Sequence, residues 1–212
     1  MDKKIIPLKF ESINDNIYSG FWSRLGANLL DMLISTPFIL LLTYINSLSL
    51  HIYFFTLIPN LVFLFWYHIY MPKRYGGTPG KIIAGIKIVK LDSSFIGWKE
   101  SFLRHSVFLT LSIISIAMTV ISILRADHEI YSNLPRLERI GYLSSLSPGT
   151  NLISALSNIW IWSEVVVLLI NKRKRAIHDY IAGTVIIKTK YVKDIQEIMN
   201  GTTKPNLPGS SA

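Results

Sequence analysis

The sequence contains no cysteine and few charged residues, and both absences narrow the class of protein. Without cysteine, the 212-residue chain forms no disulfide and no thiolate metal site. Only 17% of its residues are charged, against about 25% in ordinary soluble proteins. A secreted disulfide scaffold, a disordered chain and most soluble enzymes are therefore excluded.

Hydrophobic residues make up half of the chain, and they fall in long blocks. A helix needs about 20 mainly apolar residues to cross a bilayer, and four blocks meet this length. None of the four shows the alternation that is typical of outer-membrane strands. The expected fold is therefore an all-α membrane protein, a bundle of four transmembrane helices. The predicted spans cover about residues 21–44, 51–71, 102–124 and 152–170.

The basic residues lie almost entirely on one side of these spans. The formal net charge is +9, which in a soluble protein would suggest a nucleic-acid partner. Here nineteen Lys and Arg residues lie on the side of the two termini and three on the other side. Because cytoplasmic loops are rich in Lys and Arg, both termini are expected in the cytoplasm. We therefore predict a multi-pass protein of the cell membrane with no nucleic-acid partner.

Two polar segments on the predicted cytoplasmic side are expected to fold together. Thr78 is a favoured N-cap and Pro79 suits the first helical position, so a short helix is expected to begin there. Residues 86–90 and 184–190 are rich in β-branched residues, as is typical of strands. A lone strand would leave its backbone groups unpaired, so the two runs are expected to pair in a small cytoplasmic subdomain. The chain then divides into a cytoplasmic N-terminal segment, a membrane domain and a cytoplasmic tail with a disordered end, at residues 1–20, 21–190 and 191–212.

Residues near the predicted membrane surface indicate contact with lipid. Trp98 and Arg104 lie where the third span begins and are expected as anchors at the interface. The basic cluster at residues 172–175 directly follows the fourth span, which is typical of a stop-transfer signal. The same cluster can contact anionic lipid head groups at the cytoplasmic face, at about 1 kcal/mol per charge.

Two carboxylates lie inside the predicted spans, where an acid needs a partner or a role. An acidic group near mid-membrane costs about 2.5–3.5 kcal/mol even on insertion scales. Asp31 follows Arg24 by seven residues, so both lie on one helix face with Asn28 between them. Glu164 has no cation at helical spacing in its own span.

Two interpretations of these residues are open. In the first, Asp31 and Glu164 bind a cation or accept protons, while Arg24 and His68 tune them. In the second, the same groups form an ion pair and interhelical hydrogen bonds that hold the bundle, with Asn28 and His68 as bonding partners. Glu164 favours the first interpretation, because its span offers it no cation.

The sequence assigns no catalytic residue, no cofactor and no metal. His178 and Asp179 lack the second ligand pair that a metal site on a helix requires. No nucleophile stands with a base and an oxyanion site, so no enzyme activity is predicted.

Three segments carry a common pattern when they are taken in order. Residues 21–31 hold an arginine and an aspartate seven apart, residues 76–89 hold Gly-Gly-Thr-Pro-Gly-Lys and a strand, and residues 175–184 hold a second aspartate. Over about residues 21–190 the chain resembles the RDD family of integral membrane proteins, named for one arginine and two aspartates. The resemblance implies that these residues are Arg24, Asp31 and Asp179, with His178 beside the last.

The chain departs from a three-span version of this family in having four spans and a polar external loop at residues 125–151. Glu164 lies outside the family motifs. The resemblance supplies no reaction, since the family is largely uncharacterised and transport is a suggested role for some members.

Two functions follow as hypotheses. The first is a small cation or proton transporter, or a subunit of one. It would act as a homo-oligomer or with a membrane-protein partner, because four spans enclose little room for a pathway. The alternative is a non-catalytic membrane scaffold or accessory protein in which Arg24, Asp31 and Asp179 are structural.

The predicted orientation can be tested with a fused reporter. Alkaline phosphatase attached after Arg173 is expected to be inactive, because the enzyme folds only outside the cytoplasm and this site is predicted to be inside. A fusion within residues 125–151 serves as the active control. Activity after Arg173 would overturn the orientation.

Overall fold

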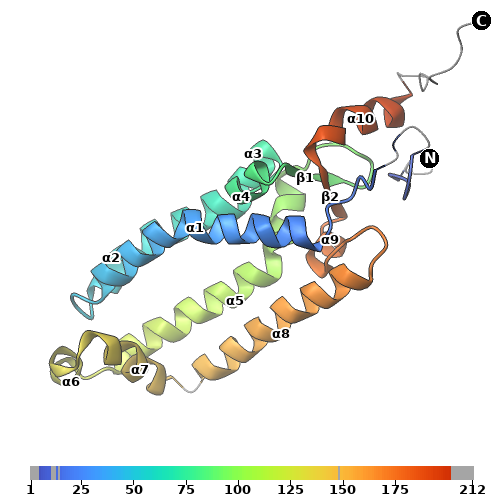
Figure 1. Cartoon of the computed structure of the whole chain (residues 1–212). Helices are drawn as coiled ribbons and strands as arrows, with labels where there is room; N and C mark the ends of the chain where they lie inside the picture. The colour runs from blue at the N-terminus through green and yellow to red at the C-terminus, as the bar shows by residue number, and fades with distance from the viewer. Residues whose placement is uncertain (1–4, 11–12, 14, 148, 202–212) are drawn as a thin grey trace, which may run out of the picture.

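Four helical runs are long and apolar enough to cross a membrane, as the sequence predicted. The computed structural model describes residues 5–10, 13, 15–147 and 149–201. The runs lie side by side along the molecule, with a small two-stranded sheet at one end (Figure 1). They are α1 (Phe21–Asn46), the run Ile52–Ile83 that begins with α2 (Ile52–Phe65), α5 (Trp98–Arg125) and α8 (Gly149–Ile170).

The second run is broken before its end. After α2 the chain makes a π-helical turn, η1 (Trp66–Tyr70), and a short helix, α3 (Met71–Tyr75). Gly76 then takes a left-handed conformation with φ +80°, which glycine adopts without strain. The chain resumes as α4 (Pro79–Ile83), the short helix predicted at Pro79, and α4 packs against α1.

The two predicted strand runs form an antiparallel pair. β1 (Ile86–Lys90) and β2 (Thr184–Lys188) align with Ile86 opposite Lys188 and Lys90 opposite Thr184. Directly before β2 comes α9 (Ile177–Ile181), and Gly183, whose φ is +64°, separates this helix from the strand. Both faces of the sheet are buried, so the sheet is an interior layer of the molecule.

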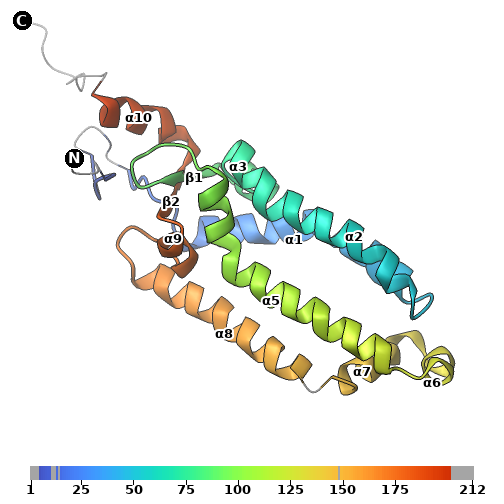
Figure 2. The same cartoon turned by 180° about the vertical axis from the view of Figure 1, so that it is seen from behind.

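One face of the sheet packs on the helical bundle. Ile88 and Ile186 form a cluster with Ala27 of α1. The opposite face carries Val89, Val185 and Ile187, which pack with the segment preceding α1 and with the last helix, α10 (Val192–Asn200). The sheet, the segment preceding α1 and α10 together are called the subdomain below. It lies at one end of the bundle, where both described ends of the chain also lie (Figures 1 and 2).

The segments outside the predicted membrane domain are more ordered than the sequence indicated. After η2 (Thr189–Tyr191), residues that were assigned to a tail form α10, whose Val192 and Ile195 are buried against the sheet. Their spacing of three puts both on one helix face, which explains the packing. Ile17, in the predicted N-terminal segment, accepts a hydrogen bond from the backbone N–H of Lys188 at 2.9 Å. The predicted disordered end, residues 202–212, lies outside the described residues.

At the end away from the subdomain, the loop of residues 125–151 folds into α6 (His128–Asn133) and α7 (Arg136–Ser145). Asp127 caps α6 by accepting from the backbone N–H of Glu129 at 2.8 Å. Nη1 of Arg139 donates to the carbonyl of Ser47 at 2.6 Å, which holds this loop against the turn between α1 and α2.

The contact between α4 and α1 can be tested with one methyl group. A Cβ at Gly80 would collide with the carbonyl oxygen of Ala27 and lie 2.7 Å from Cγ of Asp31, so G80A is expected to destabilise the protein by about 1–3 kcal/mol. A Cβ at Gly26 would meet nothing within 4 Å, and G26A is expected to be neutral or to stabilise by about 0.5–1 kcal/mol. Thermal unfolding in detergent measures both. Equal unfolding temperatures for the two variants would contradict this packing.

Candidate functional site

Asp179 is fully buried, and its carboxylate lies between two arginine side chains. Nη1 of Arg24 is 2.7 Å from Oδ2, and Nη1 of Arg104 donates to Oδ1. The backbone N–H of Ala176 donates to Oδ2 at 3.1 Å, and the Thr184 hydroxyl donates to Oδ1 at 3.3 Å. This one carboxylate therefore connects α1, α5, the start of α9 and the start of β2.

The partner of Arg24 differs from the one its spacing indicated. Arg24 was expected to pair with or tune Asp31, seven residues along the same helix. Helical side chains lean toward the N-terminus of their helix, so Arg24 reaches toward the subdomain and away from Asp31. Arg104 was expected as a membrane-surface anchor, but it is only 5% exposed and is bound to Asp179.

The charge on Asp179 is favoured despite its burial. Burial raises the pKa of this carboxyl group, but the attraction of Arg104 and Arg24 outweighs it, and the pKa lies well below its ordinary value. Asp179 is therefore ionised at neutral pH. Its backbone carbonyl also accepts from Nη2 of Arg175 at 2.9 Å, which adds a further charged donor at the same position.

Asp31 is bound to the start of α4. Its Oδ1 accepts from the Tyr67 hydroxyl at 2.6 Å and from the backbone N–H of Gly80 at 2.7 Å. Its Oδ2 accepts from the Thr78 hydroxyl at 2.5 Å, with Nζ of Lys81 at 3.6 Å. Thr78 stands at the predicted N-cap position, but its side chain makes no cap hydrogen bond and donates to Asp31 instead. Both oxygens of Asp31 are therefore occupied.

Glu164 has a partner from outside its own helix. Its Oε1 accepts from the backbone N–H of His178 at 3.0 Å. Its Oε2 lies 2.7 Å from Nδ1 of the same residue, at ion-pair distance but without the alignment of a hydrogen bond. The expectation that Glu164 lacks a cation within α8 holds, and α9 supplies this histidine.

The surroundings of His178 define its protonation. Its Nε2 lies 2.8 Å from Nη2 of Arg104, which can only donate, so Nε2 is the acceptor and the ring proton is on Nδ1, facing Glu164. Burial and the charge of Arg104 lower the pKa of His178, while Asp179 and Glu164 act in the opposite direction. The net pKa is below its ordinary value, which favours the neutral ring.

A cavity of about 390 Å³ brings most of the predicted site residues together. Those that line it are Arg24, Asn28, His68, Glu164 and His178. Asp31 and Asp179 are absent from the lining; they lie behind it, bound to the side chains of Lys81 and Arg104 that face the cavity.

Sequence reasoning missed three ionisable residues of the lining, Lys81, Arg104 and His105. His105 stands in an apolar span and could have been noticed by the same criterion as His68. The two rings are 5.4 Å apart between centroids, on α5 and η1. Within the described part of the chain, no three His, Asp or Glu side chains group closely enough to hold a metal ion.

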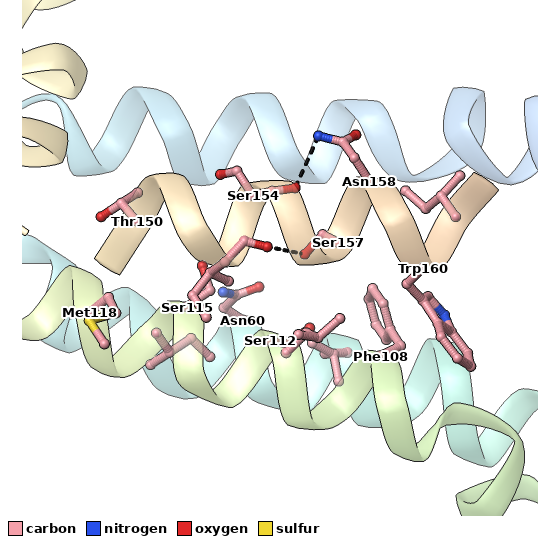
Figure 3. Close-up of a pocket in the computed structure, with 15 residues that line it drawn as sticks. Asn60, Phe108, Ser112, Ser115, Met118, Thr150, Ser154, Ser157, Asn158 and Trp160 are labelled. Atoms are coloured by element: carbon pink, nitrogen blue, oxygen red, sulfur yellow. Dashed lines mark hydrogen bonds between the residues drawn. The ribbon is translucent and has the colours of Figure 1, made fainter. Parts of the chain in front are cut away.

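A larger cavity of about 540 Å³ adjoins the first and shares Phe108, Trp160 and Ile161 with it. It lies between α2, α5 and α8, further from the subdomain. Figure 3 shows hydroxyl and amide side chains around it. The two cavities therefore differ in chemistry: the first has charged walls, whereas the second is polar and, among its described lining residues, uncharged.

The role of Asp179 can be tested by removing its charge. D179N is expected to destabilise the protein by about 3–5 kcal/mol, because two buried guanidinium groups lose their counter-charge. D194N, on an exposed residue of α10, is the matched control and is expected to change stability by about 0.5 kcal/mol or less. Thermal unfolding in detergent measures both, and equal stability of the two variants would contradict the structural role.

The stabilisation that Asp179 provides is expected to depend on pH, and D179N can be used to measure this dependence. Because the folded pKa of Asp179 lies below its unfolded value of about 3.9, the stabilisation is complete above that value and is lost only as the pH falls through the folded pKa. The difference in the free energy of unfolding between wild type and D179N should therefore be constant from about pH 8 to about pH 7, above the range in which His178, the neighbour of Asp179, takes up a proton. A difference that disappears within this range would show that the carboxyl group is not held ionised.

Comparison with known proteins agrees with these motifs. The model of the RDD family matches residues 18–183. The chain is also 35% identical over 175 residues to the uncharacterized protein YckC of Bacillus subtilis (strain 168), which covers 81% of this chain and 86% of that protein. No solved structure matches. The chain, a multi-pass membrane protein with four spanning helices, therefore belongs to the RDD family.

Proposed function

We propose that the protein is a small cation/proton transporter of the cell membrane, or a subunit of one, with both termini in the cytoplasm. The supporting observation is the position of Glu164 beside the charged cavity. One of its oxygens has no aligned hydrogen bond and lies 2.7 Å from the protonated nitrogen of His178. This pair is the proposed proton-binding group.

The three acids of the site differ in their freedom to take a proton. Asp31 accepts three hydrogen bonds and faces a lysine, and Asp179 accepts from two guanidinium groups, so protonating either would break several contacts. Glu164 makes fewer contacts: its Oε1 accepts from the backbone N–H of His178, and among the described residues its Oε2 faces only Nδ1 of His178, so a proton added to Oε2 would disturb one contact. Of the three acids, Glu164 would therefore lose the fewest contacts on taking up a proton.

The protein also offers a route from this group toward the other side. The charged cavity begins at the subdomain and adjoins the larger cavity at Phe108 and Trp160. From there to Met118, α5 advances about 15 Å at 1.5 Å per residue, or half of a hydrocarbon core of about 30 Å. Both cavities lie within a single chain, so an oligomer is not required to form this route.

In this proposal Arg24, Asp31 and Asp179 are positioning residues. They hold α4 and the subdomain against the bundle and keep Arg104 next to His178. The same contacts favour the second candidate, a membrane scaffold, because a network with all its charges paired needs no ligand to be stable.

Purified protein in liposomes that contain a pH-sensitive dye separates the two candidates. A Na⁺ or K⁺ gradient is expected to drive proton flux in the wild type, and E164Q is expected to reduce it to the level of protein-free liposomes. Glutamine at this position can still accept from the backbone of His178, so folding should be retained. E138Q, on the exposed face of α7, is the matched control and should keep full flux.

Flux that survives in E164Q would remove Glu164 from the proton pathway. Absence of flux in the folded wild type, under either gradient, would favour the scaffold.

A further inference from the structure

The larger cavity has a chemistry that the proposed proton site does not use. Its polar lining comes from three helices and carries no acid or base among the described residues. The polar side chains of this lining include Asn60 of α2, Ser112 and Ser115 of α5, and Ser154, Ser157 and Asn158 of α8.

These groups fall into two sets by their hydrogen bonds. On α8, the Ser157 hydroxyl donates to the carbonyl of Ile153 at 2.8 Å, and Nδ2 of Asn158 donates to the carbonyl of Ser154 at 3.0 Å. These are the dashed lines in Figure 3, and they stay within one helix. The α8 side chains therefore do not hold α5 or α2 in place.

The second set has no partner within the described part of the protein. The side chains of Asn60, Ser112, Ser115 and Ser154 line the cavity without a hydrogen bond. Unpaired polar groups inside a membrane are unfavourable, so they require partners that enter the cavity. The amide and the hydroxyls both donate and accept, and their partner must do the same.

The absence of charge limits what can enter. An ionised ligand would lose its hydration here and find no opposite charge among the described lining residues. The cations of the neighbouring cavity are not free for this purpose, since Arg24 and Arg104 bind Asp179 and Lys81 faces Asp31. A neutral ligand avoids this desolvation penalty.

The size and the inner wall of the cavity indicate a small molecule rather than a file of water. About 540 Å³ falls within the range of about 300–1,000 Å³ for small-molecule sites. The rings of Phe108 and Trp160 form the end next to the charged cavity and offer apolar faces. A molecule with several hydroxyl groups and a C–H surface fits both parts of this lining.

We propose that this cavity binds a small uncharged polyhydroxy solute, a polyol or monosaccharide, through Asn60, Ser112 and Ser115. The solute would be a further cargo, moved together with the cation and the protons that the Glu164–His178 pair handles, and this coupling rests on the proposed function. The site is adjacent to the pair, because the two cavities share Phe108, Trp160 and Ile161.

Uptake of labelled sorbitol into liposomes that contain the purified protein tests this binding site. The probes of matched size are gluconate, which is anionic, and N-methylglucamine, which is cationic. Saturable sorbitol uptake is expected, with both charged probes at least about tenfold slower. N60L and the double variant S112A/S115A are each expected to reduce sorbitol uptake about tenfold.

The matched control is the double variant S106A/S163A, which removes one serine of α5 and one of α8. Neither serine lines the cavity, and each bonds within its own helix. The uptake of this variant should stay within about twofold of wild type. If N60L does not fold, the binding site is still tested by sorbitol uptake in S112A/S115A and by the uptake of the charged probes in the wild type.

The outcomes separate this inference from the proposed function. Sorbitol that enters no faster than in protein-free liposomes, or charged probes that enter equally well, would overturn the inference and indicate a cavity filled by water. Proton flux driven by a cation gradient is recorded in the same liposomes without sorbitol. Proton flux without sorbitol uptake would support the proposed function and contradict the sorbitol site. Sorbitol uptake that is unchanged in E164Q would support the sorbitol site and contradict its coupling to Glu164.

Discussion

The carboxylate of Asp179 receives two guanidinium groups that come from different membrane helices, and it does so with no exposure to solvent. Removing the carboxylate or the guanidinium groups would leave a buried charge without an opposite charge. The free-energy cost of that loss is far larger than the net stabilisation gained when the ion pair forms. The position of α9, and with it the path of the chain into β2, is therefore determined by where Arg24 and Arg104 can meet. The placement of His178 beside Glu164 follows from the same contact, because His178 directly precedes Asp179.

Asp31 makes a second connection of the same kind on a smaller scale. It joins α1 to the residues that follow the break in the second run. The sheet is covered by the bundle on one face and by α10 and the N-terminal segment on the other. The interior of the subdomain is apolar and its junction with the bundle is ionic. Arg24, Asp31 and Asp179 lie at this junction, and the charged cavity begins beside it.

Features set by local patterns could be predicted from the sequence. Four spans follow from hydrophobic length, the helix at Pro79 from its start signal, and the strand pair from two β-branched runs that each needed a partner. The ion pairs could not be predicted in this way. Arg24 and Asp179 are 155 residues apart, and the chain offers 22 basic residues to few buried acids, so spacing along one helix indicated Asp31 instead. The serines at 112 and 115 were missed because hydroxyl residues are common at helix contacts, and only the arrangement of three helices shows that they face a cavity.

The order in which the charged residues occur along the chain has a consequence for assembly. Arg24 and Arg104 are synthesised 155 and 75 residues before the carboxylate that neutralises them. During translation both arginines must remain hydrated at the membrane surface, since a lone charge is costly inside the bilayer. The junction can close only after the last membrane helix and α9 have emerged, so a chain that stops short of Asp179 would carry two unpaired cations. The junction between the bundle and the subdomain therefore forms late, after all four membrane helices have been synthesised.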